Sequence, residues 1–244
     1  MRNRMRMRQA ICAALAAVVA LAGSGAAGSA ARAPARTAGA PSLGAILDGY
    51  NAGVERALAA IESLRVTQET YEPRPDGEPR RATATLVYGR GCPVERRDVT
   101  SNLVYPAGDC TLASLVGPTI DTVGYAVTLS GVETMEGEPS YRLDLLAKTR
   151  DVDHFDGTIW ISTSGLGPVR IAGVVADPPF PLREIKLDKS FTEVEGGIRL
   201  LRRHTGEAQA GAILGRKRGT RHIFYEDYRL LLAAHDPEDE ETRK

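Results

Sequence analysis

The sequence predicts a mainly β protein of the α+β class, in which an antiparallel sheet curls into a barrel or half-barrel and is covered by one N-terminal amphipathic helix. Apolar residues recur with helical spacing between residues 42 and 64, and the hydrophobic period changes to two after Arg65. Short turns rich in glycine, proline and aspartate divide the remainder. Because a long antiparallel sheet twists and curls, we expect an apolar cavity wherever the helix does not fill the concave face.

Residues 1–33 have the layout of a secretory signal peptide. Arginines at positions 2, 4, 6 and 8 precede an apolar run from about residue 10 to residue 22, and small residues follow. This run is shorter than the roughly 18 apolar residues that a membrane-spanning helix needs. We therefore expect cleavage between Ala27 and Ala40 and a periplasmic product without a spanning segment. Its predicted parts are a linker at 34–41, one domain at 42–232 and a disordered acidic tail at 233–244.

Charge and cysteine content limit the partners and the cysteine chemistry that we expect for the exported protein. Removal of residues 1–33 leaves 26 basic and 31 acidic side chains, a formal charge of −5, so nucleic acid is not an expected partner. Only Cys92 and Cys110 follow the signal. In an exported protein such a pair predicts a disulfide, which would contribute about 3 kcal/mol by restricting the unfolded chain. Metal ligation is the alternative, although the sequence has no CxxC motif and no histidine near the pair.

The segment that starts at Ser42 predicts a helix of about six turns, with Pro41 and Ser42 at its N-terminal cap. A single amphipathic helix must bury its apolar stripe on another element, and the segments that follow read as strands. We therefore expect a lid over the sheet. Its stripe comprises Leu43, Ile46, Leu47, Tyr50, Val54, Ala57, Leu58, Ile61 and Leu64, of which Leu47, Tyr50, Val54 and Leu58 are the predicted lid contacts.

Strands joined by short turns are typical of an antiparallel meander. The predicted strands are 65–72, 81–89, 125–133, 140–148, 157–163, 168–175, 183–194, 197–204 and 221–232. Every second side chain of a strand lies on the same face, which predicts an apolar concave face and a charged convex face. The residues predicted to bind lipid on the concave face are Leu143, Leu145, Ile159, Ile161, Val169, Ile171, Ile185, Leu187 and Phe191. Packing of the core is the alternative role for each of them.

The stretch DVDHFDGTIWIS, residues 151–162, places three aspartates and a histidine before a strand. A calcium loop of the EF-hand type needs oxygen ligands at positions 1, 3 and 5, glycine at position 6 and glutamate at position 12. Phe155, Asp156 and Ser162 break this pattern at positions 5, 6 and 12. We therefore predict a turn whose aspartates bond to the local backbone, and we expect no metal site.

Several segments of the meander occur together with one N-terminal helix in an exported chain: YRLDLLAK at 141–148, an acidic turn with Phe155, TIWIS at 158–162 and PVRI at 168–171. In this combination the chain resembles the outer-membrane lipoprotein-sorting family, the LolA/LolB-like carriers. The resemblance covers residues 42–232. It implies an unclosed barrel around an apolar cavity, lidded by helices, that takes up the acyl chains of a lipoprotein or lipid. It also implies that Leu143, Leu145, Ile159, Ile161, Val169 and Ile171 line the cavity.

Two function classes remain open. The first is a periplasmic carrier or chaperone for a lipid or acylated lipoprotein, in lipoprotein sorting or lipid transport, with an envelope transporter as its partner. The second is a non-enzymatic envelope sensor or interaction module of the same fold. We expect no cofactor and a monomer in either case. Catalysis is not expected, because the sequence contains no GxSxG, HExxH or Gly-rich phosphate motif.

Overall fold

The structure is a computed structural model, and it describes residues 41–74, 77–89, 94–101, 111–211 and 217–233. The predicted signal peptide, the predicted Cys92–Cys110 disulfide and the predicted tail from residue 234 lie outside these ranges. Within them the chain forms two helices, α2 (Leu43–Ala60) and α3 (Leu112–Val116), a short 3-10 turn (Glu195–Gly197) and ten strands. The strands are β1 (Ile61–Glu72), β2 (Arg80–Gly89), β3 (Glu95–Ser101), β4 (Tyr125–Met135), β5 (Glu138–Ala147), β6 (Phe155–Ser162), β7 (Pro168–Val175), β8 (Leu182–Glu193), β9 (Arg199–Ala210) and β10 (Arg218–Leu232).

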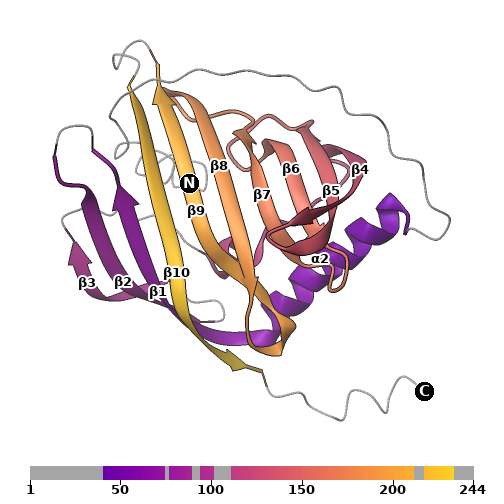
Figure 1. Ribbon diagram of the computed structural model, residues 1–244, viewed down its shortest axis with the longest axis horizontal. Coiled ribbons are helices and arrows are strands. Elements are labelled where there is room, and N and C mark those ends of the chain that lie inside the picture. Colours follow the sequence, from indigo (N-terminus) through magenta and orange to yellow (C-terminus); the bar gives the residue numbers. More distant parts are fainter. Residues whose placement is uncertain (1–40, 75–76, 90–93, 102–110, 212–216, 234–244) are drawn as a thin grey trace, which may run out of the picture.

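All ten strands belong to one antiparallel sheet, in the order β3-β2-β1-β10-β9-β8-β7-β6-β5-β4 (Figure 1). Two meanders, β1–β3 and β4–β10, join where β1 pairs with β10, so the first and last described strands lie side by side. The edge strands β3 and β4 lie at opposite ends of this order. The sheet of described strands is therefore open, and the predicted half-barrel with an N-terminal helix is confirmed.

Helix α2 begins where the sequence predicts. The Ser42 side chain caps it by accepting a hydrogen bond from the backbone N–H of Ala45 at 3.2 Å. The helix ends at Ala60, about one turn earlier than predicted, and Ile61 and Leu64 belong to β1 instead. Both side chains are still buried. Their spacing continues the helical stripe into the strand, which is why the hydrophobic pattern alone does not show the boundary.

The predicted strand bounds agree with the structure for some strands and differ for others. The strand β7 has the predicted bounds, whereas β1 starts four residues early and β9 ends six residues late relative to the predicted 65–72 and 197–204. Neither β3 nor α3 was predicted. The strand β3, ERRDVTS, has no apolar alternation because it is an edge strand, and the five-residue α3 is too short to show a helical period.

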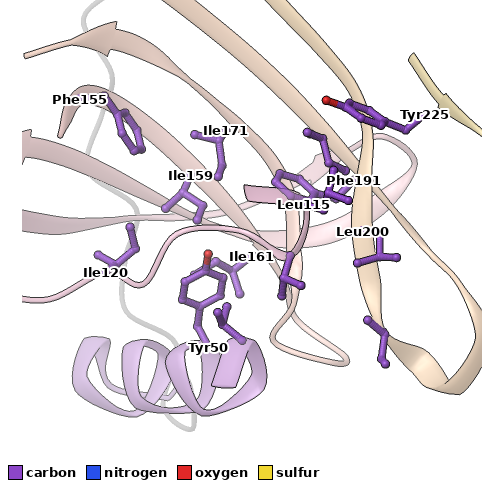
Figure 2. Close-up of a cluster of buried hydrophobic side chains, with 14 of the residues drawn as sticks. Tyr50, Leu115, Ile120, Phe155, Ile159, Ile161, Ile171, Phe191, Leu200 and Tyr225 are labelled. Carbon is purple, nitrogen blue, oxygen red and sulfur yellow. The ribbon is translucent and has the colours of Figure 1, made fainter. Parts of the chain in front are cut away.

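The hydrophobic core lies between the helices and the concave face of the sheet. Helix α2 crosses beside β4–β7 (Figure 1), and its buried residues belong to the same cluster as those of the sheet. Figure 2 shows Tyr50 pointing from the helix toward Ile120, Ile159 and Ile161. The apolar stripe of α2 is thus buried on the sheet, as the amphipathic pattern predicts.

Candidate functional site

The concave face brings the predicted lipid-binding residues together. Antiparallel partners point to the same side of a sheet, and the pairing places Leu143 beside Ile159 and Ile159 beside Ile171. The side chains of Leu143, Leu145, Ile159, Ile161, Val169, Ile171 and Phe191 are buried, whereas those of Ile185 and Leu187 are half-buried. Burial under α2 agrees with a packed core and with a covered binding face, so contact with lipid stays a prediction.

The predicted lid residues lie at the interface between helix and sheet. Leu47, Tyr50 and Val54 are buried, and Leu58 is half-buried. In the described part of the chain, the long-range side-chain hydrogen bonds of α2 run to residues 117–120, the segment that follows α3, and not to the sheet. The Tyr50 hydroxyl donates to the carbonyl oxygen of Pro118 at 2.7 Å.

Asn51 makes the second connection between these segments. Its Nδ2 donates to the carbonyl oxygen of Ile120 at 2.7 Å, and its Oδ1 accepts from the Ile120 backbone N–H at 2.9 Å. The backbone at Gly117 also passes close to α2, because a Cβ at Gly117 would lie 3.2 Å from the Tyr50 hydroxyl oxygen. Helix α2 is therefore bonded to residues 117–120, and this segment is bonded to α3 through the Gly117 backbone N–H, which donates to the carbonyl oxygen of Ala113 at 3.1 Å. We call α2, α3 and residues 117–120 the lid unit.

The turn between β6 and β7 holds the outer side of the lid. Leu166 lies against Gly49 so closely that a Cβ at Gly49 would be 2.4 Å from Leu166 Cδ1. A larger residue at this position of α2 would displace the end of the Leu166 side chain. Leu166 has a φ of 52°, a left-handed conformation that a leucine rarely adopts. The β6–β7 turn therefore contacts α2 through a residue with a strained backbone conformation.

A cavity of about 350 Å³ opens between α2, the β6–β7 turn and the β8–β9 turn. Its walls include Val54, Arg56, Arg199 and Leu232 together with several glycines, and none of the nine predicted lipid-binding residues lines it. Arg199 is only 12% exposed and donates two hydrogen bonds, of 2.5 and 2.7 Å, to the carboxylate of Glu138. The charge of Arg199 is therefore already neutralised by a structural ion pair.

The concave face is not apolar throughout, contrary to the sequence prediction. The row that contains Ile171 continues through Lys189, His204 and Ile223 to Thr70. In the next row Leu187 pairs with Gly206, and Gly206 pairs with Arg221, which forms an ion pair with Glu72. The half formed by β4–β7 is apolar, whereas the half formed by β8–β10 and β1 carries polar and charged groups. A signal for this was present in β1, where Gln68, Thr70 and Glu72 continue the buried set of Leu64 and Val66.

His204 makes this half of the face sensitive to pH. Burial and the nearby charges of Lys189 and Arg221 lower the pKa of His204 to about 3, with a smaller opposing effect from Asp188. The folded protein therefore keeps this histidine neutral, whereas the unfolded chain protonates it near pH 6.5. Its contribution to stability is complete above about pH 6.5 and decreases by about 1.4 kcal/mol per pH unit as the pH falls toward the folded pKa.

We expect His204→Asn to remove this dependence. Unfolding free energies measured in urea between pH 7.5 and pH 5 should decrease less steeply for the variant than for the wild type. The comparison between the two proteins cancels the contribution of the carboxylates. Equal slopes would contradict the assignment of a depressed pKa to His204.

The aspartate-rich segment that precedes β6 is a turn, as predicted. Asp151 Oδ1 accepts hydrogen bonds from the backbone N–H groups of Asp153 and His154 at 2.9 and 3.0 Å, and it lies 2.7 Å from His154 Nδ1. The bond to the His154 side chain and these backbone bonds hold the pKa of Asp151 below its usual value. Within the described ranges, no group of three or more metal-ligating side chains comes together.

None of the helices in the described part of the chain is long and apolar enough to cross a membrane. No family model and no curated protein matches the chain. Solved structures do match it. A LolA superfamily protein from Nitrosomonas europaea is 15% identical, with a TM-score of 0.40, and the match covers 82% of this chain and 97% of that one.

Two further structures match over a similar range. A DUF1329 family protein from Desulfovibrio piger is 12% identical, with a TM-score of 0.41, over 78% of this chain and 95% of that one. A domain from Vibrio parahaemolyticus, described as an outer membrane lipoprotein-sorting protein, is 10% identical, with a TM-score of 0.40, over 79% and 96%. The solved structures to which this chain is similar thus include proteins of the lipoprotein-sorting group that its sequence resembles.

Proposed function

We propose that the protein is a non-enzymatic carrier of the bacterial periplasm that binds the acyl chain of a lipid or lipoprotein on the concave face of its sheet, beneath α2. One observation carries the proposal. The apolar half of the face is covered by a lid unit whose side-chain hydrogen bonds from α2 stay within the unit. Such a lid contacts the sheet through apolar side chains, which an acyl chain can replace.

The closed state, with α2 on the sheet, and the loaded state, with an acyl chain in place of α2, have comparable free energies. Burial of an apolar side chain is worth about 1.5–3 kcal/mol, so the four buried residues of α2, Ile46, Leu47, Tyr50 and Val54, contribute about 6–12 kcal/mol to the closed state. An acyl chain with about 14 methylenes gains about 11 kcal/mol at 0.8 kcal/mol each. Exchange of the lid for a chain is therefore close to balanced, as a carrier that must also release its cargo requires. The cargo would be handed to or received from an envelope transporter in lipoprotein sorting or lipid transport.

A disulfide that locks the lid tests this function. A Cβ at Gly49 would lie 3.9 Å from Leu166 Cβ, within the range of about 3.5–4.5 Å found in disulfides. The double variant Gly49→Cys/Leu166→Cys should therefore form a bond between α2 and the β6–β7 turn. We expect the oxidised variant to take up no palmitate and no phospholipid, as measured by native mass spectrometry after incubation with fatty acid or vesicles.

The matched control is Gly49→Ser/Leu166→Ser, which places side chains of similar size at both positions but cannot cross-link. It should take up lipid like the wild type. Uptake by the locked protein that equals uptake by the serine variant would show that the lid does not open for cargo. A wild-type protein that binds neither fatty acid nor phospholipid would exclude the carrier function and favour the sensor or interaction module.

A further inference from the structure

Strand β1 changes character along its concave side. Leu64 and Val66 are buried and apolar, and the next three residues on the same side, Gln68, Thr70 and Glu72, are buried and polar. Gln68 stands at the transition, and its side chain is 3% exposed. Its pairing partners are Tyr225 on β10 and Ala84 on β2. The transition is therefore part of the concave face itself.

The carboxamide of Gln68 is only half satisfied. Its Nε2 donates to the Tyr225 hydroxyl at 3.1 Å, whereas its buried Oε1 has no hydrogen-bond partner. A buried acceptor without a partner is unfavourable because it has given up its hydrogen bond to water, and most buried polar groups in proteins have a partner. An acceptor in this condition on a binding face is a candidate contact for a donor on the ligand.

The neighbours of Gln68 on β2 have small side chains. On β2 the residues opposite Gln68 and Thr70 are Ala84 and Ala82, whose side chains are single methyl groups. On β10, the neighbouring strand on the other side of β1, Ile223 lies opposite Thr70. Leu64 and Val66 belong to the same hydrophobic cluster as Ile159 and Ile171 of the apolar half. An acyl chain that binds beneath α2 and extends along this cluster would thus reach Gln68 where the apolar surface ends.

Resting on the proposed function, we infer that Gln68 Oε1 accepts a hydrogen bond from the amide N–H of an N-acylated ligand, so that the carrier prefers an amide-linked acyl chain to an ester-linked one. The amide or ester linkage of such a ligand lies between its acyl chain and its polar part. Gln68 likewise stands between the apolar and the polar residues of β1, so the linkage would lie beside it. An amide presents an N–H donor at this position. An ester presents only acceptors, which leave the glutamine oxygen unpaired.

Two ligands that differ in a single group test the inference. N-palmitoylglycine and O-palmitoylglycolic acid share the acyl chain and the carboxylate, and they differ only in N–H against O at the linkage. Because one neutral hydrogen bond contributes about 0.5–1.5 kcal/mol, we expect the amide to bind up to about tenfold more tightly to the wild-type protein. Isothermal titration calorimetry at one pH and salt concentration measures the ratio of the two dissociation constants.

The variant Gln68→Met keeps the length of the side chain and removes the acceptor, so its ratio should fall to about one. The control Gln209→Met makes the same change on the opposite face of the sheet, because Gln209 pairs with Arg218 and Glu184 and alternates with Ala208 on the concave side. It should keep the wild-type preference. Because Gln68→Met also loses the hydrogen bond from Nε2 to the Tyr225 hydroxyl, its melting temperature is measured beside that of the wild type to show that the variant is folded.

Equal affinities of the wild type for the two ligands would overturn the inference and leave the carrier function standing. A preference that persists in Gln68→Met would also overturn it, because the donor would then meet another acceptor. Failure of both ligands to bind the wild type would count against the carrier function itself. The comparison on the wild type does not depend on any variant being folded.

Discussion

Replacement of Leu145 by glutamate is expected to cost about 5 kcal/mol or more and to unfold the protein, whereas the same change at Leu146 should be tolerated. The two residues are neighbours on β5, yet Leu145 is 4% exposed and Leu146 is 60% exposed. A carboxylate at position 145 would be buried in the hydrophobic core, with Val127 and Gly157 opposite it on the neighbouring strands. At position 146 it would point into water.

Urea unfolding followed by far-ultraviolet circular dichroism distinguishes the two variants. Leu146→Glu should unfold within about 0.5 kcal/mol of the wild type, and Leu145→Glu should show little cooperative transition. A folded Leu145→Glu variant that has lost lipid uptake would mean that this face is an open cavity rather than packed core. A folded variant with normal uptake would contradict both roles of Leu145.

Truncation of Tyr50 to alanine is expected to lower the free energy of unfolding by about 3–5 kcal/mol, as for other large buried side chains. Tyr50 is fully buried, and its hydroxyl bonds to Pro118 in the lid unit. Burial accordingly raises the pKa of Tyr50. Tyr50→Phe keeps the ring and loses only this partly buried hydrogen bond, which should cost about 1 kcal/mol.

Hydrogen exchange measured by mass spectrometry tests whether the parts of the lid unit open together. Tyr50→Phe should speed exchange in α2 and in the peptide that contains α3 and residues 117–120 together, with less effect on β5–β7. Equal acceleration over the whole chain would mean that Tyr50 stabilises the global fold and not the lid. If both variants had the same unfolding free energy as the wild type, Tyr50 would have no stabilising role.

The side of the sheet on which a residue lies could be predicted from the sequence, because strand alternation is strict. Leu143, Ile159 and Ile171 were assigned to one face, and the pairing places them side by side. The cap of α2 at Ser42 was equally predictable, since a cap depends on residues close in the chain. Local chemistry thus determined the helix start and the orientation of the strands β5 to β8.

Contacts between distant segments could not be predicted. The pairing of β1 with β10 joins residues far apart in the chain, and no local pattern specifies which strands meet. This pairing brings Glu72 to Arg221 and Gln68 to Tyr225. The polar half of the concave face, which holds the unpaired oxygen of Gln68, was therefore missed. It became visible only when the register was known.

The bonds of Tyr50 and Asn51 to Pro118 and Ile120 have a thermodynamic consequence for the lid unit. Because these hydrogen bonds hold the unit together internally, its release from the sheet would expose mainly apolar surface. Exposure of apolar surface raises the heat capacity, and the attraction between such surfaces weakens on cooling. The closed lid would therefore loosen at low temperature and respond little to ionic strength, the opposite of a lid fastened by salt bridges.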